Sequence, residues 1–150
     1  MGYVSEIRKK IGHDPLLIVG ASVIVTDERG RVLLQHRADN GLWGYHGGCV
    51  ELAENTEDAA RRELLEETGL TADSWEYLYT NVTDNTIYQG YLAVTSADKD
   101  SVTLQEGETI AYRWVTGPEW LDVLQSGMCE SNTRGQLDEL IRRRILKPED

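Results

Sequence analysis

Cysteines are scarce in this sequence, and the two present lie far apart. Cys49 and Cys129 form no C-x-x-C unit, so the chain lacks both the paired cysteines of a disulfide framework and those of a structural zinc site. This cysteine content suits a reducing compartment. We therefore expect a cytoplasmic protein.

Long hydrophobic runs are also missing. The apolar stretch at residues 16–25 is only about half of a membrane span. Basic residues 8–10 precede it, as in a signal peptide, but Asp14 and Pro15 interrupt the junction and no small-residue cleavage site follows. We expect neither a targeting segment nor a membrane anchor.

Basic residues are too few to balance the acidic ones. The chain has 15 Lys and Arg against 26 Asp and Glu, which gives a formal net charge of −11. Such a molecule repels the phosphate backbone of long nucleic acids, so we expect no nucleic-acid partner. A small anionic substrate would need a metal ion between its phosphates and the protein.

The sequence has no internal repeat and no low-complexity block, and its three prolines stand near the edges of expected elements. Its length of 150 residues is that of one ordinary domain, with 40% hydrophobic and 27% charged residues, as in globular proteins. We expect residues 1–150 to form a single domain.

Hydrophobic patterning predicts interleaved strands and helices. Residues 17–26 and 31–37 indicate a hairpin with its turn at Gly30, and the glycine-dense residues 40–48 indicate a loop. Further strands are expected at 75–80, 86–95 and 109–115, and helices at 118–125 and 134–146. This order favours an α/β sandwich with a mixed sheet over a helical bundle or an all-β barrel.

The most regular helix is expected at residues 56–68. Thr56 is a suitable N-cap and Gly69 follows the last helical residue. Within this helix Glu63, Glu66 and Glu67 stand at i, i+3 and i+4, so their carboxylates share one face. Spacing alone also fits a solvated charged face, because exposed like-charge pairs cost only about a few tenths of a kcal/mol.

The residues around these acids favour a functional site over a solvated charged face. The fixed positions are Gly48, Glu54, Arg62, Glu63, Leu64, Glu66, Glu67, Gly69 and Leu70. This pattern resembles the Nudix signature: a glycine, five residues, Glu, seven residues, Arg-Glu-aliphatic, one residue, Glu-Glu, one residue, Gly-aliphatic. The match holds at every fixed position, and the resemblance covers roughly residues 17–125.

The resemblance implies a Nudix-type α/β/α sandwich and a hydrolase that uses Mg²⁺, or Mn²⁺ in its place. Its substrate would contain a phosphoanhydride bond in a nucleoside diphosphate linked to another moiety. The resemblance also allows a homodimer. The alternative is a nucleotide-sensing module that keeps the fold without catalysis, whose usual mark is a broken signature; here the signature is intact.

Carried over residue by residue, the resemblance makes Glu63 and Glu67 metal ligands and Glu66 a ligand directly or through water. The Gly48 carbonyl would be a further ligand. Carboxylates suit Mg²⁺, which prefers oxygen ligands in near-octahedral geometry. Glu66 and Glu67 are also catalytic candidates, as the base within the signature if no loop acid serves.

Other residues would support the site. Glu54 and Arg62 would form a pair that orients the acids. A loop acid often acts as the base that takes a proton from the attacking water, and Glu108, six residues before Trp114, is our candidate over Glu106.

The sequence indicates the substrate-binding residues less clearly than the metal ligands. Tyr45, Tyr88, Tyr91, Tyr112 and Trp43 offer stacking surfaces for a base, although such residues more often serve ordinary packing. His46 is a candidate to meet a phosphate, although a lone loop histidine is usually a hydrogen-bonded surface residue. Relatives that prefer ADP-ribose or coenzyme A often carry a proline some fifteen residues after the signature. This chain has none between Pro15 and Pro118, which lowers the weight of both substrates.

Overall fold

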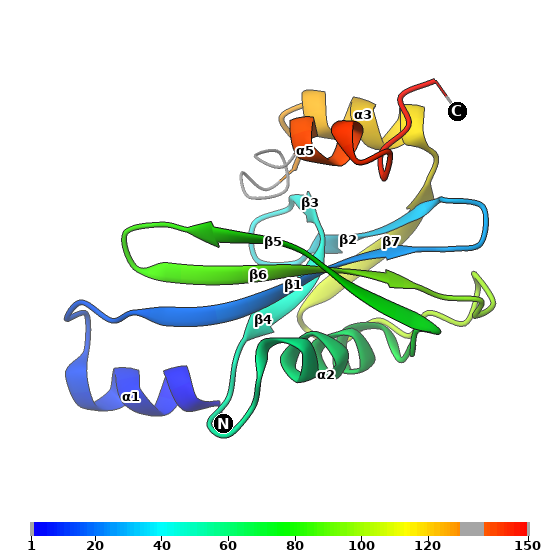
Figure 1. The fold of residues 1–150 in the computed structure, drawn as a ribbon. Helices are drawn as coiled ribbons and strands as arrows, with labels where there is room; N and C mark the ends of the chain where they lie inside the picture. Colours follow the sequence, from blue (N-terminus) through cyan, green and yellow to red (C-terminus); the bar gives the residue numbers. More distant parts are fainter. Residues whose placement is uncertain (1, 130–136, 150) are drawn as a thin grey trace.

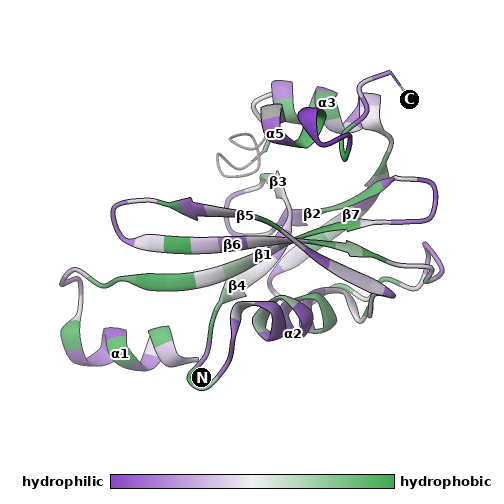
Figure 2. Cartoon of the chain, in the orientation of Figure 1, coloured by the Kyte–Doolittle hydropathy of each residue, from purple (hydrophilic) through white to green (hydrophobic). Residues whose placement is uncertain are grey.

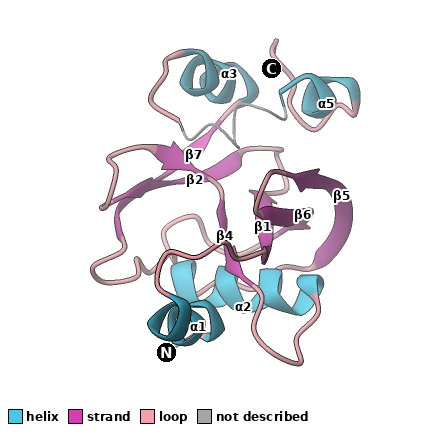
Figure 3. Cartoon of the chain, turned by 90° about the vertical axis from the view of Figure 1, so that its left-hand side faces the viewer, coloured by secondary structure: helices cyan, strands magenta, loops and turns pink. Residues whose placement is uncertain are grey.

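A mixed seven-stranded β-sheet lies between helices on both faces, in an α/β/α sandwich (Figure 1). This computed structural model describes residues 2–129 and 137–149. Helix α2 (Thr56–Thr68) covers one face of the sheet, while α3 (Gly117–Gln125) and α5 (Leu137–Arg142) cover the other (Figures 1 and 3). The fold expected from the sequence is therefore confirmed.

The strands follow the order β3-β2-β1-β6-β5, with β4 paired to β1 and β7 paired to β2. Their bounds are β1 Ile18–Thr26, β2 Val32–Arg37, β3 Trp43–Gly44, β4 His46–Cys49, β5 Ser74–Val82, β6 Thr86–Val94 and β7 Thr109–Val115. Only β1 and β6 run parallel; the other pairs are antiparallel.

The central strand β1 changes partner along its length. Its first part, Gly20 to Val23, pairs with β4, whereas Val25 and Thr26 pair with β2. This exchange places the short glycine-containing strand β4 in the middle of the sheet. Strand β4 therefore lies directly against α2, which also contacts β1 and β6.

The core forms on both faces of the sheet because strand side chains alternate. Ala21, Val23 and Val25 are fully buried on the α2 side, while Ile24 belongs to the cluster under α3 with Trp120. Figure 2 shows both hydrophobic and hydrophilic residues along α2, as expected of a helix with one face against the sheet.

The N-terminal helix α1 (Tyr3–Ile11), which the sequence did not predict, buries no residue. The Tyr3 amide donates to the Glu51 carboxylate at 2.7 Å and so joins α1 to the loop before α2. None of the helices in the described ranges is both long and apolar enough to cross a membrane.

Three expectations were wrong. Residues 40–48 are not one loop, because two strands lie within this region. Strand β3 pairs with β2, and β4 pairs with β1. Asn55, not Thr56, is the N-cap of α2, with its side chain accepting from the Asp58 amide at 2.8 Å. The expected last helix ends at Arg142, before Arg144 with φ +59°, and its expected start lies outside the described residues.

The cap of α2 can be tested by substitution. We expect Asn55→Ala to lower the free energy of unfolding by about 1 kcal/mol, because an N-terminal amide of the helix loses its acceptor. Urea denaturation measures this, and Asn55→Asp is the matched control that keeps an acceptor oxygen. Equal stability of Asn55→Ala and the parent protein would contradict the assignment.

Candidate active site

Helix α2 approaches the sheet closely because small residues face it. Ala59, Ala60 and Leu64 are fully buried against the strands. Opposite the helix, Gly48 has no side chain, and a Cβ there would stand 2.5 Å from Oε1 of Glu63. A glycine at position 48 is therefore what allows the Glu63 carboxylate to reach the backbone of β4.

Glu67 lies one turn further along the same helix face and is only 8% exposed. The Gly47 amide donates to its carboxylate at 3.3 Å, and the Gln35 amide nitrogen lies 3.5 Å from the same oxygen. Burial, then the charge of Glu63, raise the pKa of Glu67 to about 8, although the Gly47 amide and Arg37 oppose this. A buried carboxylate in this environment favours either a proton or a bound cation.

Arg62 connects the loop before α2 to the acids. Its Nε and Nη2 donate to the Glu54 carboxylate at 2.8 and 3.0 Å, its Nη2 also donates to the Cys49 carbonyl at 3.0 Å, and its Nη1 donates to Glu63 at 2.9 Å. The guanidinium lowers the pKa of Glu54. Burial raises the pKa of Glu63 in spite of Arg62. The Glu54–Arg62 pair expected from the sequence is present.

Glu66 differs from the other two acids. Its side chain is half exposed and lies 3.3 Å from Arg62. Among the residues that the structure describes, no three Asp, Glu, His or Cys side chains converge closely enough to hold a metal ion in this conformation. In this conformation the carboxylates of Glu63 and Glu66 both accept hydrogen bonds from Arg62.

The donor set nevertheless fits a hard divalent cation. Glu63 and Glu67 are both largely buried carboxylates whose pKa values are raised, and a cation beside them would stabilise their charged forms. Carboxylate and carbonyl oxygens are the ligands that Mg²⁺ prefers.

Glu108 lies near this cluster, at the start of β7. Its charge is among those that raise the pKa of Glu67. Its carbonyl accepts from the Ala38 amide at 3.0 Å, which attaches this loop to the end of β2. Glu106 lies in the turn before it, and both side chains are exposed.

A pocket of about 240 Å³ opens beside the glycines of β4, and we call it the β4 pocket. It is lined by Ala21, Ser22, Arg37, Tyr45, His46, Gly47, Gly48 and Tyr88. His46 is 2% exposed, its Nδ1 has no hydrogen-bond partner, and burial lowers its pKa to about 4. Its imidazole is therefore neutral at pH 7.

Arg37 is the residue of this pocket that the sequence analysis missed. Its guanidinium pairs with Asp39 at 3.0 Å. Its positive charge also partly offsets the rise in the pKa of the nearby Glu67. Arg37 follows Gln35 by two residues on β2, so the two side chains point to the same face of the sheet. This alternation along β2 could have indicated Arg37 as a site residue, but only if the position of β2 beside the site had been known.

The predicted aromatic residues separate into different environments. Tyr88 lines the β4 pocket. Tyr45 also lines this pocket, but its ring is 8% exposed and packs edge-on against Trp120 at 6.0 Å, so its stacking on a base stays a prediction. Tyr112 packs with the core cluster under α2 and is not among the residues that line the pocket.

Known proteins resemble this chain in sequence and in fold. The family model for the NUDIX domain matches residues 16–127. A MutT-like protein of Streptomyces ambofaciens is 38% identical over 107 residues, 70% of this chain and 68% of that protein. A putative 8-oxo-dGTP diphosphatase of Bacillus subtilis is 51% identical over 53 residues, only 35% of this chain and 36% of that protein.

Solved structures agree with the sequence comparison. The NUDIX domain of Shewanella oneidensis NrtR, complexed with ADP ribose, has a TM-score of 0.64 and 25% identity, covering 97% of this chain and 99% of that one. The chain therefore belongs to the Nudix family, and it is a hydrolase of the pyrophosphohydrolase type.

Proposed function

We propose that this protein hydrolyses a phosphoanhydride bond in a nucleoside diphosphate linked to another moiety, with Mg²⁺ as its cofactor. The observation that carries the proposal is the pair of buried carboxylates, Glu63 and Glu67, beside the Gly47–Gly48 backbone and the cationic wall of the β4 pocket. The names of the relatives, a MutT-like protein and a putative 8-oxo-dGTP diphosphatase, support a nucleotide-derived substrate.

Nudix hydrolases generally use a divalent metal ion. Here Glu63 and Glu67 would hold it, with Glu66 and the Gly48 carbonyl as further oxygen donors. When bound, Mg²⁺ neutralises phosphate charge and lowers the pKa of a bound water. Arg62 positions Glu63 and Glu54 through its hydrogen bonds and does not itself touch the reacting atoms.

The remaining residues act on the substrate and on the proton. Arg37 would pair with a phosphate oxygen, and the neutral His46 would hydrogen-bond the diphosphate at the inner wall of the pocket. Glu108 would accept the proton from the attacking water. The water oxygen then bonds to phosphorus, and the anhydride P–O bond breaks with the second phosphate as the leaving group.

The metal-ligand assignment predicts a large loss of activity. We expect Glu67→Gln to lower turnover by at least about a hundredfold, since the variant lacks the charge that holds the cation. Phosphate or pyrophosphate release from a panel of nucleotides with Mg²⁺, and with Mn²⁺ for comparison, measures this. Glu57→Gln, on the same helix but half exposed, is the matched control.

Two outcomes would count against this assignment. Near-normal turnover of Glu67→Gln would contradict the metal role. If the parent protein binds nucleotides without hydrolysing any, the sensing alternative holds. Gel filtration with light scattering would test the homodimer, which stays a prediction.

The base assignment predicts a contrast between neighbouring loop acids. Glu108→Gln should lower kcat by about a hundredfold or more with less effect on KM, because base catalysis typically contributes that much in the transition state. Glu106→Gln should change kcat little. Steady-state kinetics of both variants decide between them: the opposite pattern assigns the base to Glu106, and two unaffected variants assign it to Glu66 or Glu67.

The buried acid also predicts the pH dependence of stability without metal. Because the folded state raises the pKa of Glu67 from the usual 4.5 to about 8, the folded protein binds this proton more tightly than the unfolded chain. The stability contribution is full below about pH 4.5 and is lost as the pH rises through about 8. Thermal melting in EDTA should show this fall, and Glu67→Gln should reduce it. Equal slopes of Tm against pH in the two proteins would contradict the assigned pKa.

A further inference from the structure

A second hollow of about 110 Å³ adjoins the β4 pocket, and we call it the hydroxyl pocket. It is lined by Ser22, Tyr79, Asn81, Thr83, Thr86 and Tyr88. Ser22 and Tyr88 line both hollows, so the two are neighbours across these side chains. The hydroxyl pocket is formed by β1 and the β5–β6 hairpin, and none of its residues belongs to the Nudix signature.

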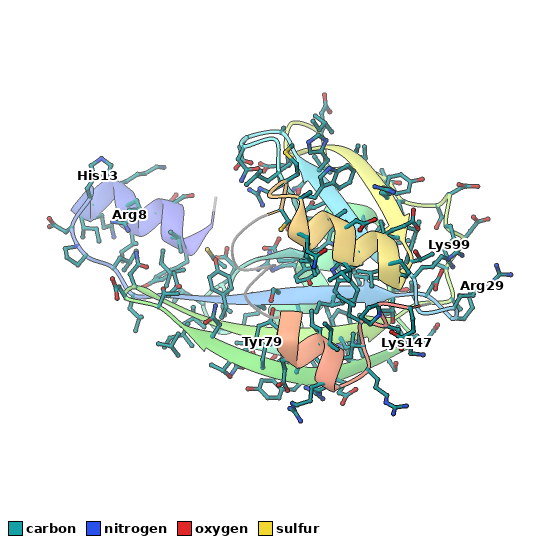
Figure 4. All side chains as sticks on the ribbon, turned by 90° about the horizontal axis from the view of Figure 1, so that it is seen from above. Arg8, His13, Arg29, Tyr79, Lys99 and Lys147 are labelled. Atoms are coloured by element: carbon teal, nitrogen blue, oxygen red, sulfur yellow. The ribbon has the colours of Figure 1, made fainter. Side chains whose placement is uncertain are left out.

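A β-bulge in β5 directs Tyr79 into this pocket. Tyr77 pairs with Tyr91, whereas Tyr79 pairs with Gly90, so the register shifts between them. The Tyr77 ring therefore meets the Tyr91 ring, while the Tyr79 hydroxyl bonds to Ser22 Oγ at 3.0 Å. Tyr79 is labelled in Figure 4, where the molecule is seen from above.

Two glycines allow the tyrosine rings to lie against the sheet. A Cβ at Gly90 would clash with the Tyr79 ring, and a Cβ at Gly20 would clash with the Tyr88 ring. Glycine weakens a strand interior, but it suits a site where another group approaches the backbone closely. The sheet thus carries two aromatic rings at the walls of one small hollow.

The lining of the hydroxyl pocket is polar but uncharged. Five of its six side chains carry a hydroxyl, and the sixth, Asn81, carries an amide. A hydroxyl both donates and accepts hydrogen bonds, as do the hydroxyls of a sugar. The β4 pocket differs, because Arg37 lines it and the Glu67 carboxylate bonds to its Gly47 wall. Charged phosphates therefore suit the β4 pocket, and a neutral polyhydroxyl group suits its neighbour.

We infer that the hydroxyl pocket binds a sugar ring of the substrate while the diphosphate lies in the β4 pocket. This inference rests on the proposed function. The sugar has two chemical sources: the terminal sugar of a nucleoside diphosphate sugar, or the ribose of the nucleoside. The two rings can stack on a nucleobase, but specific recognition of the edge of a base uses amide, arginine and carboxylate side chains, which bond to it in pairs. Asn81 alone among these side chains is of that kind.

The test compares two threonines of one hairpin. Thr86 lines the hydroxyl pocket, whereas the Thr80 hydroxyl points to the other face, where it contacts Tyr77 and Gln89. The ratio of kcat/KM for UDP-glucose to that for UTP measures recognition of the terminal sugar. The ratio for UTP to that for dUTP measures recognition of the ribose hydroxyl. We expect Thr86→Val to lower one of these two kcat/KM preferences at least about fivefold, as the loss of a hydrogen bond to bound substrate does.

The matched control is Thr80→Val, which removes the same hydroxyl from the same hairpin and should leave both preferences unchanged. If neither preference changes in Thr86→Val, or if both variants change equally, the inference is overturned. Thermal melting of both variants separates a folding defect from a binding defect.

Binding can be read without turnover, which separates failure of this inference from failure of the proposed function. In Glu108→Gln with Mg²⁺, which should turn over slowly but still bind substrate, amide NMR signals of Asn81, Thr83 and Thr86 should shift more with UDP-glucose than with UTP, or more with UTP than with dUTP. Shifts confined to Gly47 and Gly48 would overturn the sugar site. Absence of hydrolysis in the parent protein would overturn the proposed function alone.

Discussion

The close packing of α2 against β4 is the constraint on which the rest of the site depends. Ala60 and Leu64 are buried under the sheet, and Gly48 leaves its side-chain space to Glu63. The carboxylates of Glu63 and Glu67 are consequently shielded from water and accept only a few hydrogen bonds from the protein in its place. Arg62 offsets this cost at Glu63, while Glu67 has its pKa raised. The packing that supplies oxygen donors thus also creates the need for a cation beside them.

Local spacing explains why the helix and its acids could be predicted from the sequence. Residues at i and i+4 share a helix face whatever surrounds them, so Glu63 and Glu67 had to lie together once the helix formed. The helix cap depends on more distant residues. The Thr56 hydroxyl bonds to Gln89 and Tyr91 of β6, which leaves Asn55 as the cap. Nothing in the spacing near position 56 indicates a partner some thirty residues away.

Residues 40–48 could not be predicted well because their structure is imposed from outside. Glycines disfavour strands, yet β4 forms because β1 leaves β2 and offers its backbone to this segment. Once the segment is extended, alternation places Tyr45 in the core beside Trp120 and His46 against the other face. The role of Arg37 was hidden for the same reason, since only the strand order places β2 near the acids.

The strand order also separates chemistry from selectivity. Glu63, Glu67 and Arg62, which carry the proposed chemistry, lie on α2, whereas the hydroxyl pocket belongs mainly to the β5–β6 hairpin, and the two regions meet at β1. Ser22 of β1 lines both hollows, and the parallel pairing sets Gly20 beside Tyr88. A substitution in the hairpin can therefore alter what binds without moving the buried acids. In the binding mode that we propose, a chain with a net charge of −11 accepts a phosphorylated ligand because the anionic part of the ligand meets Arg37 and its neutral part meets uncharged walls.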